Sequence, residues 1–459
     1  MPRVPVPVVG DAYADTVAPF AAQETTNWVP EKSERQGTRT VTLLKTPDGL
    51  QSFSTVGAGT VRGNITMAGV AYVVADTMLY SVASDGTETA LGTIEGSGRV
   101  GIAENGTQVV VVNGPKGWVY EPGGVGFVQI TDPDFPGAVD CFFIGQYVVF
   151  IQSDTDEWFI SALADVTSFD ALDFARAETL TDELLGGVAL SNNVVLFGER
   201  SIEVWQNTGA ADFPFERIAV VERGIAAAFA KALLDNTVFW LGNDGIAYRA
   251  NGYQPERIST RPIEQAFAAE ELSEAFCLGY EKGGHAFFVV SFPNGKTWVY
   301  DAAHGAWHRR KSFELARWRA NTYLFAYGRH LVGDFQSGRL WELKDDVYTE
   351  GDDPIVSERK TQYLSKDGEY GRMSEFELVF NAGQGLATGQ GSAPLIDFCY
   401  SDDGGRTFKN WRQTSLGLIG KYAGRARFHG LGRSRQRMFW LRVSDLVRRD
   451  VMGAEAVIA

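Results

Sequence analysis

The sequence predicts an all-β protein: a β-propeller of six or seven blades, an N-terminal extended arm and a C-terminal β-sandwich-like domain. The main observation is a repeat of two short apolar strands around a Gly, Asn or Asp turn, which ends on an aromatic residue. Seven copies are present, and they end on Tyr80, Tyr120, Phe159, Trp205, Tyr248, Tyr300 and Trp341. Successive copies lie about 40–50 residues apart, which is the length of a four-stranded propeller blade.

Residues 1–55 are expected to form the N-terminal arm and a closing strand. Residues 1–35 are proline-rich and irregular, which predicts an extended segment. Alternating Thr, Val and Leu residues over 38–44 predict a strand. The following Thr46-Pro47-Asp48-Gly49 predicts a turn, because proline fixes φ and glycine tolerates a positive φ.

Residues 56–346 are expected to form the propeller. The hairpin over 109–120 reverses at Asn113-Gly114, a pair that suits tight strand reversals. Two segments interrupt the repeat. Residues 169–185 are long and charged, and residues 262–276 carry apolar side chains at helical spacing, which predicts an inserted helix on the rim. Since one repeat could pair with the arm or with the C-terminal sheet, six and seven blades both stay open.

Residues 347–459 are expected to form an acidic linker and a basic C-terminal β-domain. Acids and a proline crowd residues 345–354, as is typical of a linker. Strands are predicted over 375–380, 395–400, 425–428 and 438–443. Between Arg406 and Arg449 there are twelve Lys or Arg residues and one acid, Asp445, although the whole chain carries a net charge of −15. This segment is either a solvated sheet face or a surface that docks on an acidic partner or nucleic acid.

Bulk composition narrows the class of protein. Apolar residues make up 44% and charged residues 22% of the chain, which is ordinary for a globular protein. No apolar run reaches the roughly 18 residues of a membrane span, and no secretory signal is visible. The cysteines Cys141, Cys277 and Cys399 lack C-x-x-C spacing, so we expect buried thiols rather than disulfides or a zinc site.

The segment 401–408 matches the pattern S-x-D-x-G-x-T-[FW], and its defining residues are Ser401, Asp403, Gly405, Thr407 and Phe408. It resembles the Asp-box turn of sialidase propellers. That resemblance implies a structural hairpin in which Asp403 caps backbone N–H groups, Gly405 supplies the turn geometry and Phe408 packs beneath. The pattern occurs once and outside the propeller repeats, so we interpret it as a structural turn.

No catalytic or metal-binding constellation stands out. Acidic pairs such as Asp132 and Asp134 are plentiful, and nothing singles out the pair that glycoside hydrolysis needs. His304 and His308 are four residues apart, but on a predicted turn this spacing does not place them on one face. Neither a phosphate-binding loop nor a nucleophile elbow is present. We therefore expect no enzyme activity, cofactor or metal.

Segments spread in order along nearly the whole chain carry a further resemblance. They are Asn27-Trp28-Val29-Pro30-Glu31, residues 43–50, Gly96-Ser97-Gly98-Arg99-Val100, residues 158–161, residues 176–187, residues 201–209, residues 223–226, residues 299–302 and the basic finish over 403–443. Together they resemble the packaged-DNA stabilisation proteins of short-tailed bacteriophages, also called tail hub or nozzle proteins. The chain departs from that family's Thr-Pro-Gly-Leu pattern by placing Asp48 between Pro47 and Gly49.

The resemblance implies a structural protein of the virion, assembled in the host cytoplasm. It implies a homo-oligomer, a hexameric ring, below the portal and its adaptor protein, with tail spikes or fibres bound outside. The ring would retain packaged double-stranded DNA and conduct it during ejection, and a tail needle or plug would close the channel. Two other classes stay open: a propeller glycan hydrolase or glycan-binding module, favoured by the Asp-box, and a propeller scaffold for protein assembly in a cell.

The charge distribution suggests how such a ring would assemble. An acidic propeller leaves the channel neutral or repulsive toward DNA, whose phosphates bind Lys and Arg strongly. We expect the basic terminus, through Arg425, Arg427, Arg433 and Arg435, to dock on an acidic surface of a neighbouring subunit or of the adaptor. The acidic residues 345–353 are a candidate partner for these arginines within the ring.

Overall fold

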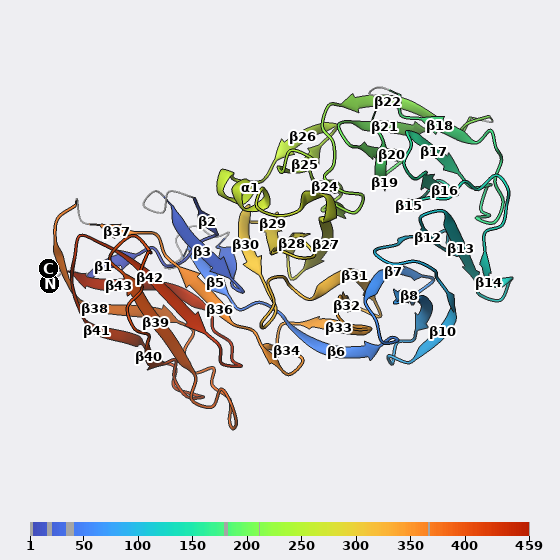
Figure 1. Ribbon diagram of the computed structural model, residues 1–459. Helices are drawn as coiled ribbons and strands as arrows, with labels where there is room; N and C mark the ends of the chain where they lie inside the picture. Colours follow the sequence, from blue (N-terminus) through green and yellow to red (C-terminus); the bar gives the residue numbers. More distant parts are fainter. Residues whose placement is uncertain are drawn as a thin grey trace.

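The computed structural model describes residues 3–15, 21–33, 41–178, 182–210, 212–365 and 368–458. Figure 1 shows two domains, a circular array of sheets and a β-sandwich beside it. The array contains seven four-stranded blades among the described residues, with strands in antiparallel order. The all-β propeller with a sandwich-like domain that the sequence predicts is therefore confirmed, and the blade number is seven.

The first four blades follow one another along the chain without interruption. The first two comprise β7 (Val61–Met67), β8 (Val70–Ala75), β9 (Met78–Val82) and β10 (Glu88–Thr93), then β11 (Gly101–Glu104), β12 (Val109–Asn113), β13 (Lys116–Glu121) and β14 (Gly126–Gln129). The next two comprise β15 (Asp140–Ile144), β16 (Tyr147–Ile151), β17 (Glu157–Ile160) and β18 (Phe174–Arg176), then β19 (Leu184–Leu190), β20 (Asn193–Gly198), β21 (Ile202–Asn207) and β22 (Phe215–Val221).

The fifth and sixth blades also use four consecutive strands, whereas the seventh takes its outer strand from the N-terminal segment. The fifth comprises β23 (Lys231–Leu234), β24 (Thr237–Leu241), β25 (Ala247–Asn251) and β26 (Gln254–Arg257), and the sixth comprises β27 (Phe276–Lys282), β28 (His285–Ser291), β29 (Thr297–Asp301) and β30 (Ala306–Arg310). The seventh comprises β31 (Ala320–Ala326), β32 (Arg329–Asp334), β33 (Arg339–Lys344) and β6 (Gly49–Thr55).

The circle closes through an N-terminal strand. β6 pairs antiparallel with β33, so the last blade takes its outer strand from the segment that precedes the first blade. At the centre, β31 contacts β7 and joins the ends of the array. This closure explains why seven repeats that each contain a strand pair form seven complete blades.

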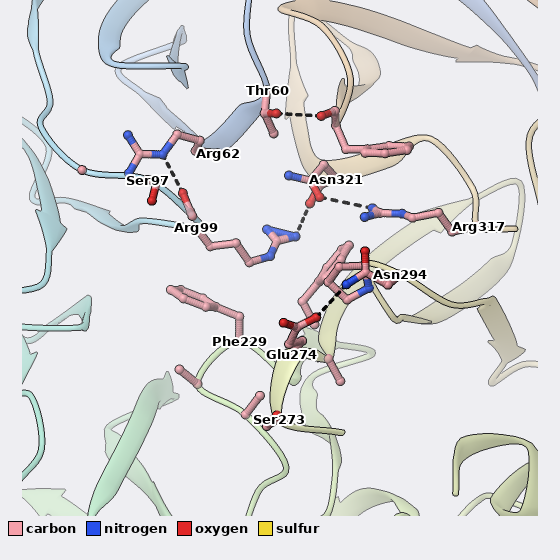
Figure 2. Close-up of a pocket in the computed structure, with 18 of the residues that line it drawn as sticks. Thr60, Arg62, Ser97, Arg99, Phe229, Ser273, Glu274, Asn294, Arg317 and Asn321 are labelled. Atoms are coloured by element: carbon pink, nitrogen blue, oxygen red, sulfur yellow. Dashed lines mark hydrogen bonds between the residues drawn. The ribbon is translucent and has the colours of Figure 1, made fainter. Parts of the chain in front are cut away.

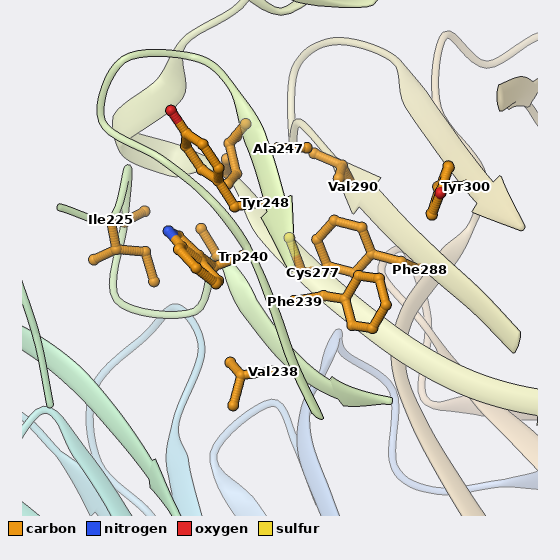
Figure 3. Close-up of a cluster of buried hydrophobic side chains, with 14 of the residues drawn as sticks. Ile225, Val238, Phe239, Trp240, Ala247, Tyr248, Cys277, Phe288, Val290 and Tyr300 are labelled. Carbon is orange, nitrogen blue, oxygen red and sulfur yellow. The ribbon is translucent and has the colours of Figure 1, made fainter. Parts of the chain in front are cut away.

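The aromatic residues that end the repeats belong to the packed interior. Phe159 lies parallel to Phe150, with ring centroids 5.2 Å apart. Tyr248 stacks on Trp240 at 5.4 Å within the apolar cluster between blades that Figure 3 shows. Burial of such large side chains is the main stabilising contribution to a propeller, because blade faces pack like layers of a core.

The sandwich is built from both ends of the chain. One of its sheets orders β4 (Val29–Lys32), β5 (Thr42–Lys45), β43 (Val451–Ile458), β38 (Gly371–Phe380) and β41 (Ala426–Ser434), and β1 (Arg3–Val6) pairs with β43. The other includes β36 (Ser357–Lys360), β42 (Gln436–Val443), β39 (Leu395–Ser401) and β40 (Arg412–Ser415), with β37 (Leu364–Ser365) at its edge. Between them, Phe398 stacks on Phe428 with ring centroids 4.2 Å apart.

One continuous sheet joins the two domains. From blade six it runs through β30, β3 (Ala22–Thr26) and β36 into β42, and β2 (Tyr13–Ala14) pairs with β3. Asn27 fixes the crossing point: its amide donates to the carbonyls of Lys311 and Val356, both at 2.9 Å. The described part of the N-terminal arm is thus extended but not free, because its strands are shared by both domains.

The rim helix is shorter than the apolar spacing predicts. α1 covers Arg261–Phe267, a single 3-10 turn covers Leu272–Glu274, and Phe276 already begins β27. The apolar side chains Ile263 and Phe267 are buried as helix positions, whereas Phe276 is buried as a strand position of blade six. Of the strand expected over 38–44, residues 38–40 lie outside the described residues, and β5 begins at Thr42.

The acidic segment after the propeller differs from the expected free linker. β34 (Thr349–Glu350) and β35 (Asp353–Pro354) extend the sheet of blade seven. Glu350 is buried and accepts from Arg319 Nε at 3.1 Å, while Arg319 also binds Asp353 at 2.7 Å. Burial raises the pKa of Glu350, and the neighbouring arginines Arg310 and Arg319 oppose that rise. These acids are therefore engaged within their own chain.

Candidate assembly surface

The predicted interface arginines all lie at or beside one sandwich strand. β41 carries Arg427 and Arg433, while Arg425 precedes the strand and Arg435 follows it. All four side chains are exposed to some degree, but they form two pairs with different surroundings. One pair surrounds a buried carboxylate, and the other lies against a tyrosine at the opposite end of the strand.

Glu377 is the buried carboxylate. It lies on β38 with 1% of its side chain exposed, and three guanidinium groups surround it. Arg425 Nη1 lies 2.5 Å from Oε1, whereas Arg427 Nε and Arg3 Nη1 lie 2.9 and 2.8 Å from Oε2. We call these four residues the Glu377 cluster.

Strand register explains how residues so distant in sequence meet. Glu377 pairs directly with Arg427 on one side and with Glu455 on the other. Arg3 lies on β1, which pairs with β43 beyond Glu455. Directly opposed residues of neighbouring strands project on the same face of a sheet, so the ladder β1–β43–β38–β41 gathers these side chains.

The cluster strongly favours the ionised carboxylate. Burial by itself would raise the pKa of Glu377, but the hydrogen bonds from Arg3, Arg425 and Arg427 outweigh burial and lower the pKa to about 2. The carboxylate therefore stays charged over the physiological range. Arg425 and Arg427 therefore already have an ion-pair partner, Glu377, within the sandwich.

Arg433 and Arg435 have no such carboxylate partner among the described residues. Their guanidinium carbons lie 5.8 and 4.7 Å from the ring centroid of Tyr370, which is 59% exposed. A guanidinium over an exposed aromatic ring is weakly stabilised and keeps most of its N–H donors available. This pair is therefore free to bind another molecule, as are the exposed Arg406, Lys409 and Lys421 elsewhere in the described basic segment.

Other basic residues of the segment meet acceptors in the chain. Arg437 forms two bonds to Asp402, at 2.7 and 3.0 Å, and Arg442 Nε donates to Asp397 at 2.9 Å. Arg449 is buried and donates to backbone carbonyls and to a serine hydroxyl. The acidic partners lie outside 406–449 in sequence, on or beside neighbouring strands, which is why the charge count missed them.

Close to these strands, two loops expose an apolar surface. The backbone N–H of Gly420 donates to Gly383 O at 3.3 Å, which holds the loops together. The exposed apolar side chains on these loops are Leu386, Leu418, Ile419 and Tyr422. We call this set the apolar tip. Clustered exposed apolar groups of this kind are typical of surfaces that contact another protein.

The Asp-box residues form a tight, internally bonded turn after β39. Asp403 accepts from the Thr407 backbone at 2.9 Å and from its hydroxyl at 2.5 Å, and Ser401 Oγ donates to Asp403 at 2.7 Å. These hydrogen bonds lower the pKa of Asp403. Gly405 has φ +78°, a value that favours glycine, and Phe408 meets Trp440 edge to face. The polar groups are used within the turn, so this geometry gives no support to sugar binding.

The histidines singled out by spacing do not come together. His308 is buried on β30, where burial and Arg310 lower its pKa to about 3. His304 instead joins His285, and both Nδ1 atoms lie 2.8 Å from Asp301 Oδ2. The ligand atoms of these three residues lie within 4.8 Å of one another, the spacing that a metal requires. Direct hydrogen bonds already account for this arrangement.

Two family models match the chain, one for each domain. The first describes the β-propeller of bacteriophage P22 Gp10 and matches residues 2–348. The second describes the β-sandwich of the same protein and matches residues 357–459. The chain therefore belongs to the bacteriophage P22 Gp10 family. The resemblance that the ordered sequence segments carry is confirmed.

One curated relative of the chain is named a tail hub protein. The chain is 26% identical over 259 residues to the tail hub protein gp10 of Salmonella phage P22, and the match covers 51% of this chain and 55% of the relative. The chain thus spans about half the length of that relative. The family is one of structural tail hub proteins of the phage virion. Among the described residues, no helix is long and apolar enough to cross a membrane.

Solved structures show only distant likeness. The computationally designed Ika8 protein matches with a TM-score of 0.40 and 13% identity, over 64% of this chain and 99% of its own. The mitotic checkpoint complex matches with a TM-score of 0.43 and 10% identity, over 68% of this chain and 96% of its own. Similarities this low carry no argument about function.

Proposed function

We propose that the chain is the ring subunit of a short phage tail. Six copies form a hub below the portal and its adaptor, retain the packaged DNA and conduct it during ejection. The observation that supports this most is the ordered match of both domains to P22 Gp10, whose curated member is named a tail hub protein. Tail spikes or fibres bind outside the ring, and a needle or plug closes its channel.

The junction between the domains suits a part that bears load. The shared sheet runs from β27 of the propeller to β40 of the sandwich without a flexible connection. Hydrogen bonds from Asn27 to Lys311 and Val356 lock the crossing strand on both sides. A ring that retains pressurised DNA needs subunits whose domains do not swing apart, and a continuous sheet provides that stiffness.

The charge arrangement suits a conduit rather than a DNA-binding protein. Proteins that hold DNA do so through many Lys and Arg contacts to phosphates. This chain carries a net charge of −15, and several of its C-terminal arginines, in the Glu377 cluster and at Arg437 and Arg442, already have carboxylate partners in the sandwich. The wall of the channel therefore does not bind DNA tightly, and retention falls to the needle or plug that closes the channel.

The contact between subunits involves the sandwich. Arg433 and Arg435 keep free donors at the C-terminal end of β41, and the apolar tip exposes side chains on two loops at the opposite end of that strand. Arg425 and Arg427 contribute indirectly, because they keep the sheet intact around Glu377. The proposed partner surface is an acidic face of the neighbouring subunit or of the adaptor.

A charge reversal at the free pair tests this proposal. We expect Arg433→Glu combined with Arg435→Glu to prevent ring formation or adaptor binding while the monomer stays folded. Light scattering after size exclusion and negative-stain imaging, with and without the adaptor-capped portal, measure the outcome. Arg406→Glu is the matched control, since Arg406 is exposed and makes one long bond to the Asp403 carbonyl, at 3.4 Å.

Two results would contradict parts of the proposal. Normal rings from the double variant would exclude the free pair as the subunit contact, and altered DNA retention in such rings would make the pair a DNA contact instead. A wild-type chain that stays monomeric at every concentration, and also beside the adaptor-capped portal, would contradict the hub role itself.

A further inference from the structure

A pocket of about 630 Å³ lies at one end of the propeller axis. It is lined by the segments that enter the innermost strands β7, β11, β23, β27 and β31, as Figure 2 shows in close-up. Pockets of roughly 300–1,000 Å³ are of the size that holds small molecules. Five of the seven blades contribute to its walls, so the closed circle itself fixes its shape.

Three arginines converge on this pocket: Arg62 from β7, Arg99 from the loop before β11 and Arg317 from the loop before β31. Their hydrogen-bond partners are neutral oxygens. Arg62 donates to the carbonyls of Gly98 and Asp76, at 2.5 and 2.8 Å. Arg99 donates to the carbonyl of Asn321, and Arg317 donates to backbone carbonyls and to the Asn321 side chain.

No carboxylate of the described residues forms an ion pair with any of the three. Two carboxylates, Asp76 and Glu274, also line the pocket, so the three arginines outnumber its acids by one. Glu274 accepts from the Asn294 amide at 3.1 Å, Asp76 acts on Arg62 only through its charge, and so does Asp334 on Arg317. Burial lowers the pKa of Arg99 to about 9, an effect to which the like charge of Arg317 adds. Burial also lowers the pKa of Arg317 to about 10. Arg62 Nη2 and Arg99 Nε are buried without an acceptor.

Aromatic packing holds two of these guanidinium groups in place. The Arg99 and Arg317 guanidinium carbons lie 3.7 and 4.9 Å from the ring centroid of Phe276, and Arg317 also lies 4.3 Å from that of Phe335. Stacking of this kind removes side-chain freedom before a ligand arrives. The two guanidinium groups are therefore held in place at the pocket wall, as Figure 2 shows for Arg99 and Arg317.

We infer that this pocket binds a small oxyanion, a phosphate or a carboxylate group. Three positive charges without an ion-pair partner, in a concave site built by five blades, match the charge and the planar donor geometry that Arg offers to such groups. The inference goes beyond the hub role, since neither assembly nor DNA passage requires a ligand in the propeller. A duplex is far too wide for the pocket, so the anion is a small molecule or a single exposed group.

Titration of the full-length chain tests the inference. The probes are inorganic phosphate and glucuronate, added separately at low ionic strength, with sodium chloride at matched ionic strength as the reference. Calorimetry is expected to show saturable binding of one anion per chain, and thermal unfolding is expected to shift upward with ligand concentration. Tighter phosphate binding identifies a phosphate site, and tighter glucuronate binding identifies a carboxylate site.

Variants assign the binding to the pocket. Arg99→Gln and Arg317→Gln are each expected to weaken binding about tenfold or more, since each removes charged donors. Arg99→Lys keeps the charge without the planar fork and covers the case in which a glutamine variant does not fold. Arg406→Gln, far from the pocket, serves as the control. Equal shifts with chloride, or unchanged affinity in folded Arg99 variants, would overturn the inference.

Discussion

Arginines cluster both on the sandwich surface and in the propeller pocket, but only those around Glu377 have a carboxylate as an ion-pair partner. Around Glu377, three guanidinium groups share one buried carboxylate, and the pKa of that carboxyl falls to about 2. In the pocket, Arg99 and Arg317 meet only neutral oxygens, and burial lowers their own pKa values. The arginines around Glu377 are thus neutralised although they lie in the most basic part of the sequence, whereas the pocket of the acidic propeller holds arginines without an ion-pair partner.

Removal of the shared carboxylate is expected to have the largest effect. Glu377→Gln removes the buried carboxylate that accepts from Arg3, Arg425 and Arg427. Hydrogen bonds to charged groups contribute about 1.5–3 kcal/mol each, so we expect a loss of about 3 kcal/mol in the free energy of unfolding. Urea unfolding measures the loss of stability, and hydrogen exchange on β38 and β41 shows where it occurs. Glu375→Gln, on the same strand and more exposed, should cost about 1 kcal/mol or less. Equal costs would contradict the special role of Glu377.

The same cluster predicts a pH dependence in the acid range. Because the pKa of Glu377 is lowered in the folded state, from 4.5 to about 2, its contribution is present above about pH 4.5 and is lost as the pH falls toward 2. Urea unfolding at pH 7, 4.5 and 3 should show a steeper loss for the wild type than for Glu377→Gln. Parallel curves for the two proteins would show that Glu377 does not titrate with folding.

Loss of a charged group from the pocket should change the free energy of unfolding much less than loss of the Glu377 carboxylate. Arg99→Gln removes a buried cation that has no ion-pair partner, so we expect the stability without added anion to stay within about 1 kcal/mol of the wild type. Urea unfolding in a chloride-only buffer checks this. A loss as large as that of Glu377→Gln would mean that Arg99 is neutralised by its surroundings, and the comparison between the two regions would fail.

The free pair on the sandwich should have the smallest effect on the isolated chain. Reversal of Arg433 and Arg435 is expected to change the free energy of unfolding by about 0.5 kcal/mol or less, because exposed side chains with weak ring contacts contribute little. Thermal unfolding of the monomer measures this before any assembly assay. A large loss would show that the pair supports the fold, and its assembly phenotype would then need another explanation.

Most of the fold could be predicted from local sequence patterns. The closing aromatics, such as Phe159 and Tyr248, repeat because each blade packs one large side chain, fully or partly buried, at the same place on its third strand, and such a period is visible in sequence. Turn residues such as Asn113-Gly114 mark hairpins for the same local reason. The sequence predicts a rim helix that is too long, because Phe276 fits a helical spacing and a strand equally well.

Pairings across long stretches of chain could not be read from sequence. Arg3 and Glu377 are 374 residues apart, and only the order β1–β43–β38 brings them together. The sequence places Glu350 in a solvated linker, because nothing in it shows that the partner residue Arg319, just before β31 of blade seven, lies beside it. The arginines of the pocket come from three separate loops and strands, and no spacing in the sequence signals their convergence.

Imaging of the full-length chain mixed with adaptor-capped portal is the most direct test of the hub role. We expect a closed ring of six subunits at the distal end of the adaptor, with the sandwich strand β41 and the apolar tip at subunit contacts. Single propellers scattered beside bare portals, or a ring joined only through propeller faces with the sandwich pointing into solvent, would contradict it.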